Sequence, residues 1–253
     1  MGRVVAVVNQ KGGVGKTTTA VNLAAGLAVV ERPTLLVDLD PQGNATTGLG
    51  LSKEALYPTI YHVLLGGEPL EKAVRETAVP NLFLVPADID LVGAEVELVG
   101  LPGRESKLKD ALEVLRGKFD YVLLDCPPSL GLLTVNALTA ADSALVPLQC
   151  EFYALEGLAQ LLKTIRLVRD RVNARLEVEG IVLTMFDGRT SLAGQVKAEV
   201  HRYFSGQIFQ TVIPRNVRLS EAPSHGKPIL LYDLRSSGAL AYLELTKEVL
   251  AHD

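Results

Sequence analysis

A glycine-rich stretch near the N-terminus constrains the fold of this chain more than any other feature. Residues 9–19 read NQKGGVGKTTT and directly follow an apolar run at 4–8. Glycines placed between a strand and a helix that begins near Lys16 let backbone N–H groups and the helix N-terminus converge on one anion-sized space. The stretch therefore predicts a phosphate-binding loop held by a strand–loop–helix unit. A plain glycine-rich turn is the alternative.

The loop departs from the usual phosphate-binding pattern, G-x-x-x-x-G-K-[ST]. Gly15, Lys16 and Thr17 fill its last three places, but Gln10 stands where the first glycine should be. Beside it, Lys11 adds a second ammonium group at the mouth of the loop. The strict pattern fails, and a modified loop entry is expected.

Each polar residue of the loop has an expected contact with a nucleoside triphosphate. Lys16 would hold the β- and γ-phosphates, Thr17 would ligate Mg²⁺, and Thr18 would bond to the α-phosphate. The residues expected to surround the phosphates are Gly12, Gly13, Val14, Gly15, Lys16, Thr17 and Thr18.

Apolar and helical segments alternate along the chain. Strands are expected at 4–8, 34–37, 82–85, 121–124, 144–146, 181–183 and 211–213, because these runs are almost continuously apolar. Helices are expected at 17–30, 107–115, 133–140, 155–172, 192–204 and 239–250. This alternation predicts a doubly wound α/β fold, in which a mostly parallel sheet carries helices on both faces. Residues 49–80 are the least regular, and we expect surface helices and loops there.

Composition limits the classes of protein to which the chain can belong. Its 253 residues are 48% hydrophobic, enough to bury the core of one domain spanning 1–253, with two smaller domains the alternative. No apolar run reaches the length of about 18 residues that a membrane span needs, and no signal-peptide pattern opens the chain, so we expect a cytoplasmic protein. Cys126 and Cys150 lack metal or redox spacing and are expected as buried free thiols. The net charge of −4 argues weakly against a nucleic-acid partner, although basic residues are relatively more frequent toward the C-terminal half.

Two strands end in aspartates that the fold should bring to the phosphates. In VDLDPQGNAT, Asp38 and Asp40 alternate with Leu39 and so face the same side of an extended chain. We expect Asp40, which lies further into the loop, to orient an attacking water, and Asp38 to lie nearer the metal. The alternative is that both carboxylates cap the turn at 41–43. In FDYVLLDCPPS, Asp125 has the Walker B position, which delivers a carboxylate to Mg²⁺ directly or through water.

Five separated blocks now resemble one family. KGGVGKTT, DLDPQGNAT, DCPPSLGLLTVNAL, EFYALEGL and IPRNVRLSEAPSHGKPI occur in the order found in the ParA/Soj partitioning ATPases, within the deviant-Walker group of P-loop NTPases that includes MinD. The resemblance runs from about residue 3 to residue 249.

The resemblance implies an ATPase that uses ATP and Mg²⁺ and forms an ATP-dependent homodimer. Lys11 matches the family's lysine that crosses a two-fold interface to the partner's phosphates, which makes it a catalytic and nucleotide-binding residue together with Lys16 and Asp40. Three further residues, Pro214, Arg215 and Asn216, would border the adenine, with Asn216 as a base-edge partner.

The resemblance also implies macromolecular partners. Family dimers bind double-stranded DNA non-specifically, and Arg189 and Arg218 match DNA-binding positions. A ParB/Spo0J-type centromere-binding protein would stimulate hydrolysis, the initiator DnaA is suggested by kinship alone, and the dimer would be associated with the nucleoid. Charge and helical spacing add weaker DNA-binding candidates, which are Arg166, Arg169, Arg171, Arg175, Lys197 and Arg202.

Three other functions compete with this interpretation. A MinD-like membrane-bound regulator would end in a basic amphipathic helix, but ALAYLELTKEVLAHD holds one lysine against Glu244, Glu248 and Asp253. An iron–sulfur relative needs thiolates at cluster spacing, which Cys126 and Cys150 do not supply. A DNA-coating protein that never hydrolyses ATP would not need Asp40. Site-specific repression is not expected, because only about eight residues precede Asn9.

Overall fold

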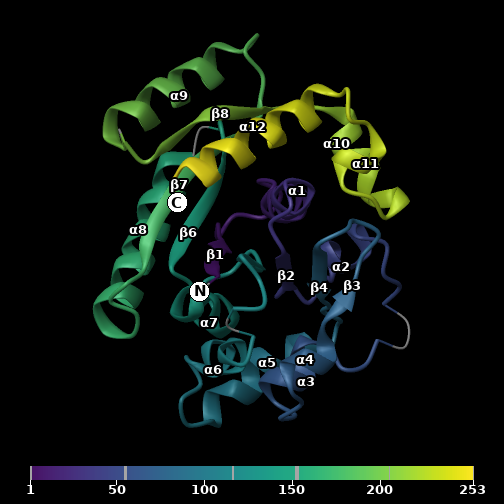
Figure 1. Ribbon diagram of the computed structural model, residues 1–253. Coiled ribbons are helices and arrows are strands. Elements are labelled where there is room, and N and C mark those ends of the chain that lie inside the picture. The colour runs from purple at the N-terminus through teal and green to yellow at the C-terminus, as the bar shows by residue number, and fades with distance from the viewer. Residues whose placement is uncertain (1, 54–55, 116, 152–153, 205, 253) are drawn as a thin grey trace.

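Eight strands form one sheet in the computed structural model, which describes residues 2–53, 56–115, 117–151, 154–204 and 206–252 (Figure 1). The strands are β1 (Arg3–Val7), β2 (Thr34–Asp38), β3 (Arg75–Glu76), β4 (Leu82–Val85), β5 (Tyr121–Asp125), β6 (Ser143–Gln149), β7 (Glu177–Phe186) and β8 (Ile208–Pro214). Their order across the sheet is β3-β4-β2-β5-β1-β6-β7-β8. Every neighbouring pair is parallel except β3 and β4, which confirms the predicted mostly parallel sheet.

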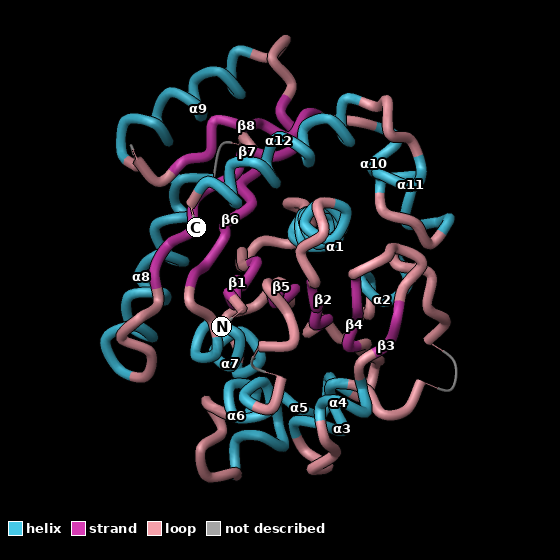
Figure 2. Tube along the Cα trace, in the orientation of Figure 1, coloured by secondary structure: helices cyan, strands magenta, loops and turns pink. Residues whose placement is uncertain are grey.

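Helices cover both faces of this sheet (Figure 2). The α-helices are α1 (Lys16–Val29), α2 (Asn44–Gly48), α3 (Ile60–Leu64), α4 (Leu70–Ala73), α5 (Leu91–Glu97), α6 (Lys107–Glu113), α7 (Leu132–Ala140), α8 (Ala154–Arg171), α9 (Ser191–Tyr203), α10 (Val217–Glu221), α11 (Ile229–Tyr232) and α12 (Ser237–Ala251). Two 3₁₀ turns, η1 (Leu98–Gly100) and η2 (Ala222–His225), extend α5 and α10. All six predicted helices are present.

The alternation of buried side chains along β1 divides the core into two parts. Val4 and Ala6 pack with residues of α7 and α8 on one face of the sheet, whereas Val5 and Val7 pack with residues of α1 and α12 on the other. In Figure 1, α1 and α12 accordingly lie above the central strands, and α5, α6 and α7 lie below them. The uninterrupted apolar runs of these strands are explained by burial on both faces.

The strand β3 was not expected from the sequence. It occupies two residues in the segment 49–80 and pairs antiparallel with β4 through Arg75 and Glu76. Two residues are too few to show an alternating apolar pattern, and both side chains are charged. The other described residues of the segment form the short helices α3 and α4 and loops, as predicted.

Candidate functional site

The glycine-rich loop follows β1 and reaches the start of α1 through two left-handed glycines. Gly13 has φ 72°, and Gly15, the N-cap of α1, has φ 88°. Residues with a side chain rarely adopt such angles, so these two glycines permit the turn. Lys16 is buried, and its ammonium donates to the carbonyl oxygen of Lys11 at 2.9 Å. Burial lowers the pKa of Lys16, while Asp125 and other nearby acidic groups oppose this effect.

Long-range hydrogen bonds fix the entry to the loop. The Asn9 carboxamide donates to the carbonyl oxygen of Pro147 at 2.8 Å and accepts from the Lys11 backbone N–H at 3.0 Å. The Gln10 carboxamide donates to Gly157 and Gln160 of α8, at 3.3 and 3.1 Å. Gln10, in the place of the missing glycine, thus ties the loop to α8, which the sequence pattern did not reveal.

A further tether holds the middle of the loop. The hydroxyl of Thr184, at the end of β7, donates to the carbonyl oxygen of Val14 at 2.8 Å, and both residues are buried. Because Thr184 lies 170 positions away, no local sequence signal marks this contact. The loop is therefore held from β6, β7 and α8 at once.

Lys11 lies at the surface. Its side chain is 47% exposed, and its ammonium forms an ion pair with Glu151, which follows β6. The two residues after Glu151, within the EFYALEGL block, lie outside the described residues.

The predicted carboxylates come together because β2 and β5 are neighbours in register. Asp38 lies directly opposite Asp125, and both are completely buried. Asp38 accepts hydrogen bonds from the backbone N–H and hydroxyl of Thr46, at 2.8 and 2.7 Å, and from the Asp40 N–H at 3.2 Å. Burial raises the pKa of Asp38 to about 6 despite these donors.

Asp125 has no such donors. Neither of its carboxylate oxygens has a hydrogen-bond partner among the described residues, and burial, followed by the charge of Asp38, raises its pKa well above the usual value. Thr17 and Lys16 lower this pKa, although no contact with Thr17 meets hydrogen-bond geometry. Asp40 is also buried and accepts from the Gln42 N–H at 2.9 Å.

This donor set fits Mg²⁺ bound together with a nucleotide. A buried carboxylate without a partner, next to the Thr17 hydroxyl, supplies the hard oxygen ligands that Mg²⁺ takes, usually one or two from the protein and the rest from phosphates and water. Within the described parts of the chain, no three His, Cys, Asp or Glu residues are grouped as a metal site of their own. A metal held at Asp125 would therefore take further ligands from phosphate oxygens and water.

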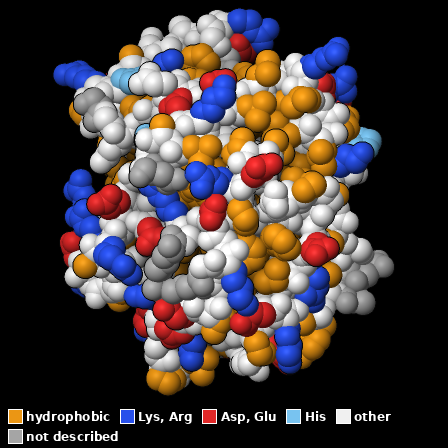
Figure 3. All heavy atoms as spheres, in the orientation of Figure 1, with side chains coloured by type: hydrophobic (Ala, Val, Ile, Leu, Met, Phe, Trp, Pro, Cys, Tyr) orange, Lys and Arg blue, Asp and Glu red, His pale blue; other side chains and the backbone are white. Residues whose placement is uncertain are grey.

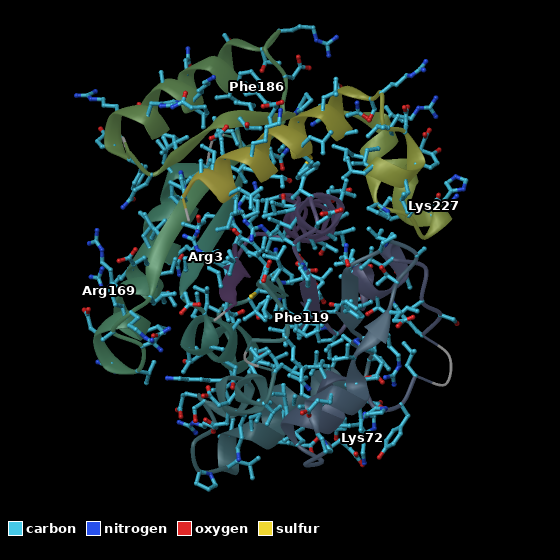
Figure 4. All side chains as sticks on the ribbon, in the orientation of Figure 1. Arg3, Lys72, Phe119, Arg169, Phe186 and Lys227 are labelled. Atoms are coloured by element: carbon cyan, nitrogen blue, oxygen red, sulfur yellow. The ribbon has the colours of Figure 1, made fainter. Side chains whose placement is uncertain are left out.

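Two cavities adjoin the loop on the side of α10. One, of about 250 Å³, is lined by Gly15, Thr18, Thr184, Met185, Pro214, Arg215, Asn216 and Tyr242 among others. The second, of about 260 Å³, shares Thr18, Leu219 and Pro223 with the first and extends to Lys227, labelled in Figure 4. Another cavity, at the opposite ends of β1 and β5, measures about 40 Å³ and is too small for a nucleotide.

Asn216 borders the first cavity with its side chain already engaged. Its carboxamide oxygen caps α10 by accepting from the Arg218 and Leu219 N–H groups, and its nitrogen donates to Ser237 at 2.8 Å. These bonds use one of the two N–H donors of the carboxamide, so a contact with a base edge is compatible with them and stays a prediction.

The two predicted DNA-binding arginines are exposed and paired. The Arg189 side chain is 88% exposed and forms a two-pronged bond with Asp187, which helps to lower the Asp187 pKa to about 2. Arg218 is 54% exposed and pairs with Glu221 at 2.9 Å and Asp233 at 3.5 Å. Figure 3 shows Lys and Arg scattered over the drawn face of the molecule, with Asp and Glu among them. Arg169 lies on α8, on the opposite side of the view from Lys227 (Figure 4).

No helix in the described parts of the chain combines the length and the hydrophobicity needed to span a bilayer. The terminal helix α12 is packed in the core, where Tyr242 and Leu245 are buried and the Tyr242 hydroxyl lies 3.1 Å from that of Thr19 in α1.

Comparisons with known proteins agree with the fold and the loop. A family model described as "AAA domain" matches residues 2–178. Sporulation initiation inhibitor protein Soj of Bacillus subtilis is 57% identical over 252 residues, which cover 100% of each chain. Chromosome partitioning protein ParA of Myxococcus xanthus is 57% identical over 253 residues, covering 100% of this chain and 89% of that protein.

Among solved structures, a Mycobacterium smegmatis protein named cobyrinic acid a,c-diamide synthase, with bound ATP analogue and magnesium, matches with a TM-score of 0.88 and 42% identity. The match covers 100% of this chain and 96% of that one. Together with the full-length identity to Soj and ParA, these matches agree with the five sequence blocks and with the geometry of the loop. The chain therefore belongs to the ParA/Soj family of chromosome-partitioning P-loop ATPases.

Proposed function

We propose that this chain is a Mg²⁺-dependent ATPase that ATP switches into a sandwich dimer, and that the dimer binds double-stranded DNA non-specifically until hydrolysis releases it. One observation carries the ATPase: the buried Asp125 carboxylate has no hydrogen-bond partner among the described residues, yet it lies beside Lys16 at the end of a glycine-rich loop. A buried charge without a partner is costly, so its retention points to a bound cation. The names of the relatives support the partition role.

The residues of the loop would bind and orient the triphosphate. The backbone N–H groups of Gly12, Gly13, Val14 and Gly15 would bind the phosphates at the start of α1, Lys16 would hold the β- and γ-phosphates, and Thr18 would bond to the α-phosphate. Bound Mg²⁺ would supply charge neutralisation at the β- and γ-phosphates.

The acidic residues would divide two tasks between them. Asp125 and Thr17 would hold the metal, while the Asp38 oxygens already accept hydrogen bonds from Thr46 and from the Asp40 N–H, which would place Asp38 in a supporting role nearer the metal shell. Asp40 orients the attacking water and accepts its proton. Because Asp38 binds the Asp40 backbone, it also positions that loop.

Lys11 would act across the dimer interface. Its ammonium is exposed, and the ion pair with Glu151 is a surface pair of the kind that contributes about 1 kcal/mol or less. Breaking this ion pair so that Lys11 can contact the phosphates of the partner subunit's ATP therefore costs little free energy. A second positive charge at the phosphates then makes ATP part of the interface and works like an arginine finger.

DNA binding would use Arg189 and Arg218. Each guanidinium group is exposed and bonded to carboxylates, so a DNA phosphate would replace one anion with another. Such contacts carry no sequence information and weaken steeply with salt. A ParB/Spo0J-type protein would stimulate hydrolysis on the nucleoid in the cytoplasm, and DnaA is a further candidate partner.

A MinD-like membrane function is less well supported. Such a function requires a helix that is free to lie on a bilayer. Here α12 is packed against α1 and β8 and contributes Tyr242, Leu245 and Val249 to the core. Its exposed positions include Glu244 rather than a row of basic residues.

The test is co-sedimentation of the Asp40→Ala protein with non-specific double-stranded DNA, in ATP and in ADP, across a salt series. We expect binding that requires ATP and decreases with salt, because the variant traps the ATP dimer. The wild-type protein should show phosphate release that Asp40→Ala lacks. Absence of DNA binding under every condition would refute the DNA part while leaving an ATP-dependent dimer.

A further inference from the structure

Helix α5 exposes an apolar stripe to solvent. Ile89, Val92, Val96 and Val99 are 64%, 54%, 75% and 55% exposed. Their 3-4-3 spacing across α5 and its flanking turns places them along one face, which we call the α5 stripe. The opposite face is also apolar, since Leu91, Ala94 and Leu98 are completely buried. A helix that is apolar on both faces is normally covered on both.

Carboxylates lie on both sides of the α5 stripe. By helical position, the N-cap Asp90 and the exposed Glu97 lie on one side. Glu95 lies on the other side, where its carboxylate is bonded to α7, and the half-buried Asp88 precedes the stripe. The Asp90 carboxylate has no partner among the described residues, and Glu97 accepts a hydrogen bond from Tyr61 at 3.1 Å. A basic group, Arg104, lies only at the C-terminal end, where it donates to the Val99 carbonyl at 2.7 Å and pairs with a neighbouring glutamate. The surface is therefore apolar with acidic margins.

One end of α5 is bonded to the loop that follows Asp125. The Glu95 carboxylate accepts hydrogen bonds from the Leu132 and Leu133 N–H groups, at 2.8 and 3.3 Å, at the start of α7. A side chain at Gly131 would collide with this carboxylate, so the glycine permits the close approach. A displacement of α5 would thus be transmitted to the segment between Asp125 and α7.

The segment that leads from β4 into α5 is linked to Asp38 through α2. The Thr46 hydroxyl of α2 donates to Asp38 at 2.7 Å and accepts from the Ala87 N–H at 3.1 Å, two residues before the stripe begins. The stripe and the segment before it are therefore linked to Asp38 through Thr46, and to the start of α7 through Glu95. In Figure 1, α5 lies at the lower edge of the molecule, beside α3 and α6.

We propose that the α5 stripe is the docking surface for a basic amphipathic helix of a protein partner, and that docking alters the loops of Asp38 and Asp125. The charges select this occupant, because apolar residues flanked by lysines or arginines complement an apolar stripe flanked by carboxylates. Stripe-to-stripe packing of two copies would bring acidic margins together, and anionic lipid would be repelled. The stripe spans about 15 Å, so about three turns of helix cover it. The effect of docking on the loops of Asp38 and Asp125 rests on the proposed ATPase function, whereas docking itself does not.

Docking is tested by fluorescence anisotropy with the full chain and a labelled 18-residue peptide of leucine and lysine. Its leucines follow the 3-4-3 spacing, and a scrambled peptide of the same composition controls for charge. The matched variants are Val96→Lys in the stripe and Leu240→Lys on α12, a position that is also exposed. We expect the wild type and Leu240→Lys to bind the patterned peptide at least about tenfold more tightly than the scrambled one, and Val96→Lys to lose this preference.

Equal affinity for the two peptides, or equal loss in both variants, would overturn docking at this surface. Self-association of the wild type that Val96→Lys abolishes would do the same and assign the stripe to a second copy. The regulatory part is tested by phosphate release at saturating peptide, which should change for the wild type and not for Glu95→Gln. An unchanged wild-type rate would overturn it. Absence of any phosphate release, with docking intact, would instead count against the ATPase itself.

Discussion

Replacing Asp125 by asparagine should stabilise the nucleotide-free protein and abolish its response to Mg²⁺ and ATP. The side chain is completely buried and neither oxygen has a hydrogen-bond partner in the described parts of the chain, so the substitution breaks no hydrogen bond seen there and removes the carboxylate charge. Replacing buried ion pairs by uncharged groups of similar volume is often neutral or stabilising, by about 1–4 kcal/mol, and we take this range for the loss of the Asp125 charge. We expect the unfolding free energy at pH 7.5 to rise within that range.

The unfolding free energy of the wild type should decrease with rising pH because of Asp125. Burial raises the pKa of Asp125, so between about pH 4 and the folded pKa the native chain binds more protons than the unfolded chain. The unfolding free energy therefore falls as pH rises through this window. Asp38 contributes in the same direction, because a pKa raised from 3.8 to about 6 costs about 3 kcal/mol above pH 6. Asp187, whose pKa is lowered to about 2, acts only below about pH 4 and leaves the window undisturbed.

The measurement is urea denaturation of the wild type and Asp125→Asn in EDTA at pH 7.5 and pH 5. The gain from the substitution should be larger at pH 7.5, where the wild-type carboxylate is driven toward ionisation. An exposed control, Asp90→Asn, should change stability by no more than about 0.5 kcal/mol. With Mg²⁺ and ATP at 100 times the dissociation constant, the wild type should gain about 2.7 kcal/mol and the variant much less. A variant less stable than the wild type in EDTA would refute the reasoning.

Three further substitutions test separate parts of the site. Lys11→Ala should leave ATP binding largely intact but abolish the ATP-dependent dimer in sedimentation velocity, and a dimer of unchanged strength would exclude the crossing role. Arg218→Glu should weaken DNA binding and reduce its salt dependence, and affinity equal to the wild type would remove Arg218 from the interface. Thr184→Val should weaken ATP binding about tenfold, because the buried Val14 carbonyl loses a hydrogen-bond donor worth about 1–3 kcal/mol. Unchanged ATP affinity in calorimetry would show that this tether does not contribute to binding.

The sequence predicted the strands, the major helices and the convergence of the aspartates because each depends on local pattern and on the order of βαβ units. It did not predict the tethers of the loop. Gln10 contacts Gly157, and Asn9 contacts Pro147, across separations of 147 and 138 residues. A polar side chain at a loop entry has many possible partners, and only the packed fold selects one. The stripe on α5 was missed for a related reason, since valines there fit a buried helix equally well.

The distribution of hydrogen bonds explains how one site can be both rigid and responsive. The glycine-rich loop is held by Asn9, Gln10 and Thr184, so its backbone is arranged before any ligand arrives, which lowers the ordering cost of binding. Asp38 is likewise bonded in place, whereas Asp125 is buried without a donor. A cation therefore gains more free energy by binding at Asp125, whose oxygens accept no hydrogen bond from the described residues, than at Asp38. Because a ligand stabilises whichever state binds it, this unsatisfied carboxylate makes the loop before α7 sensitive to the nucleotide.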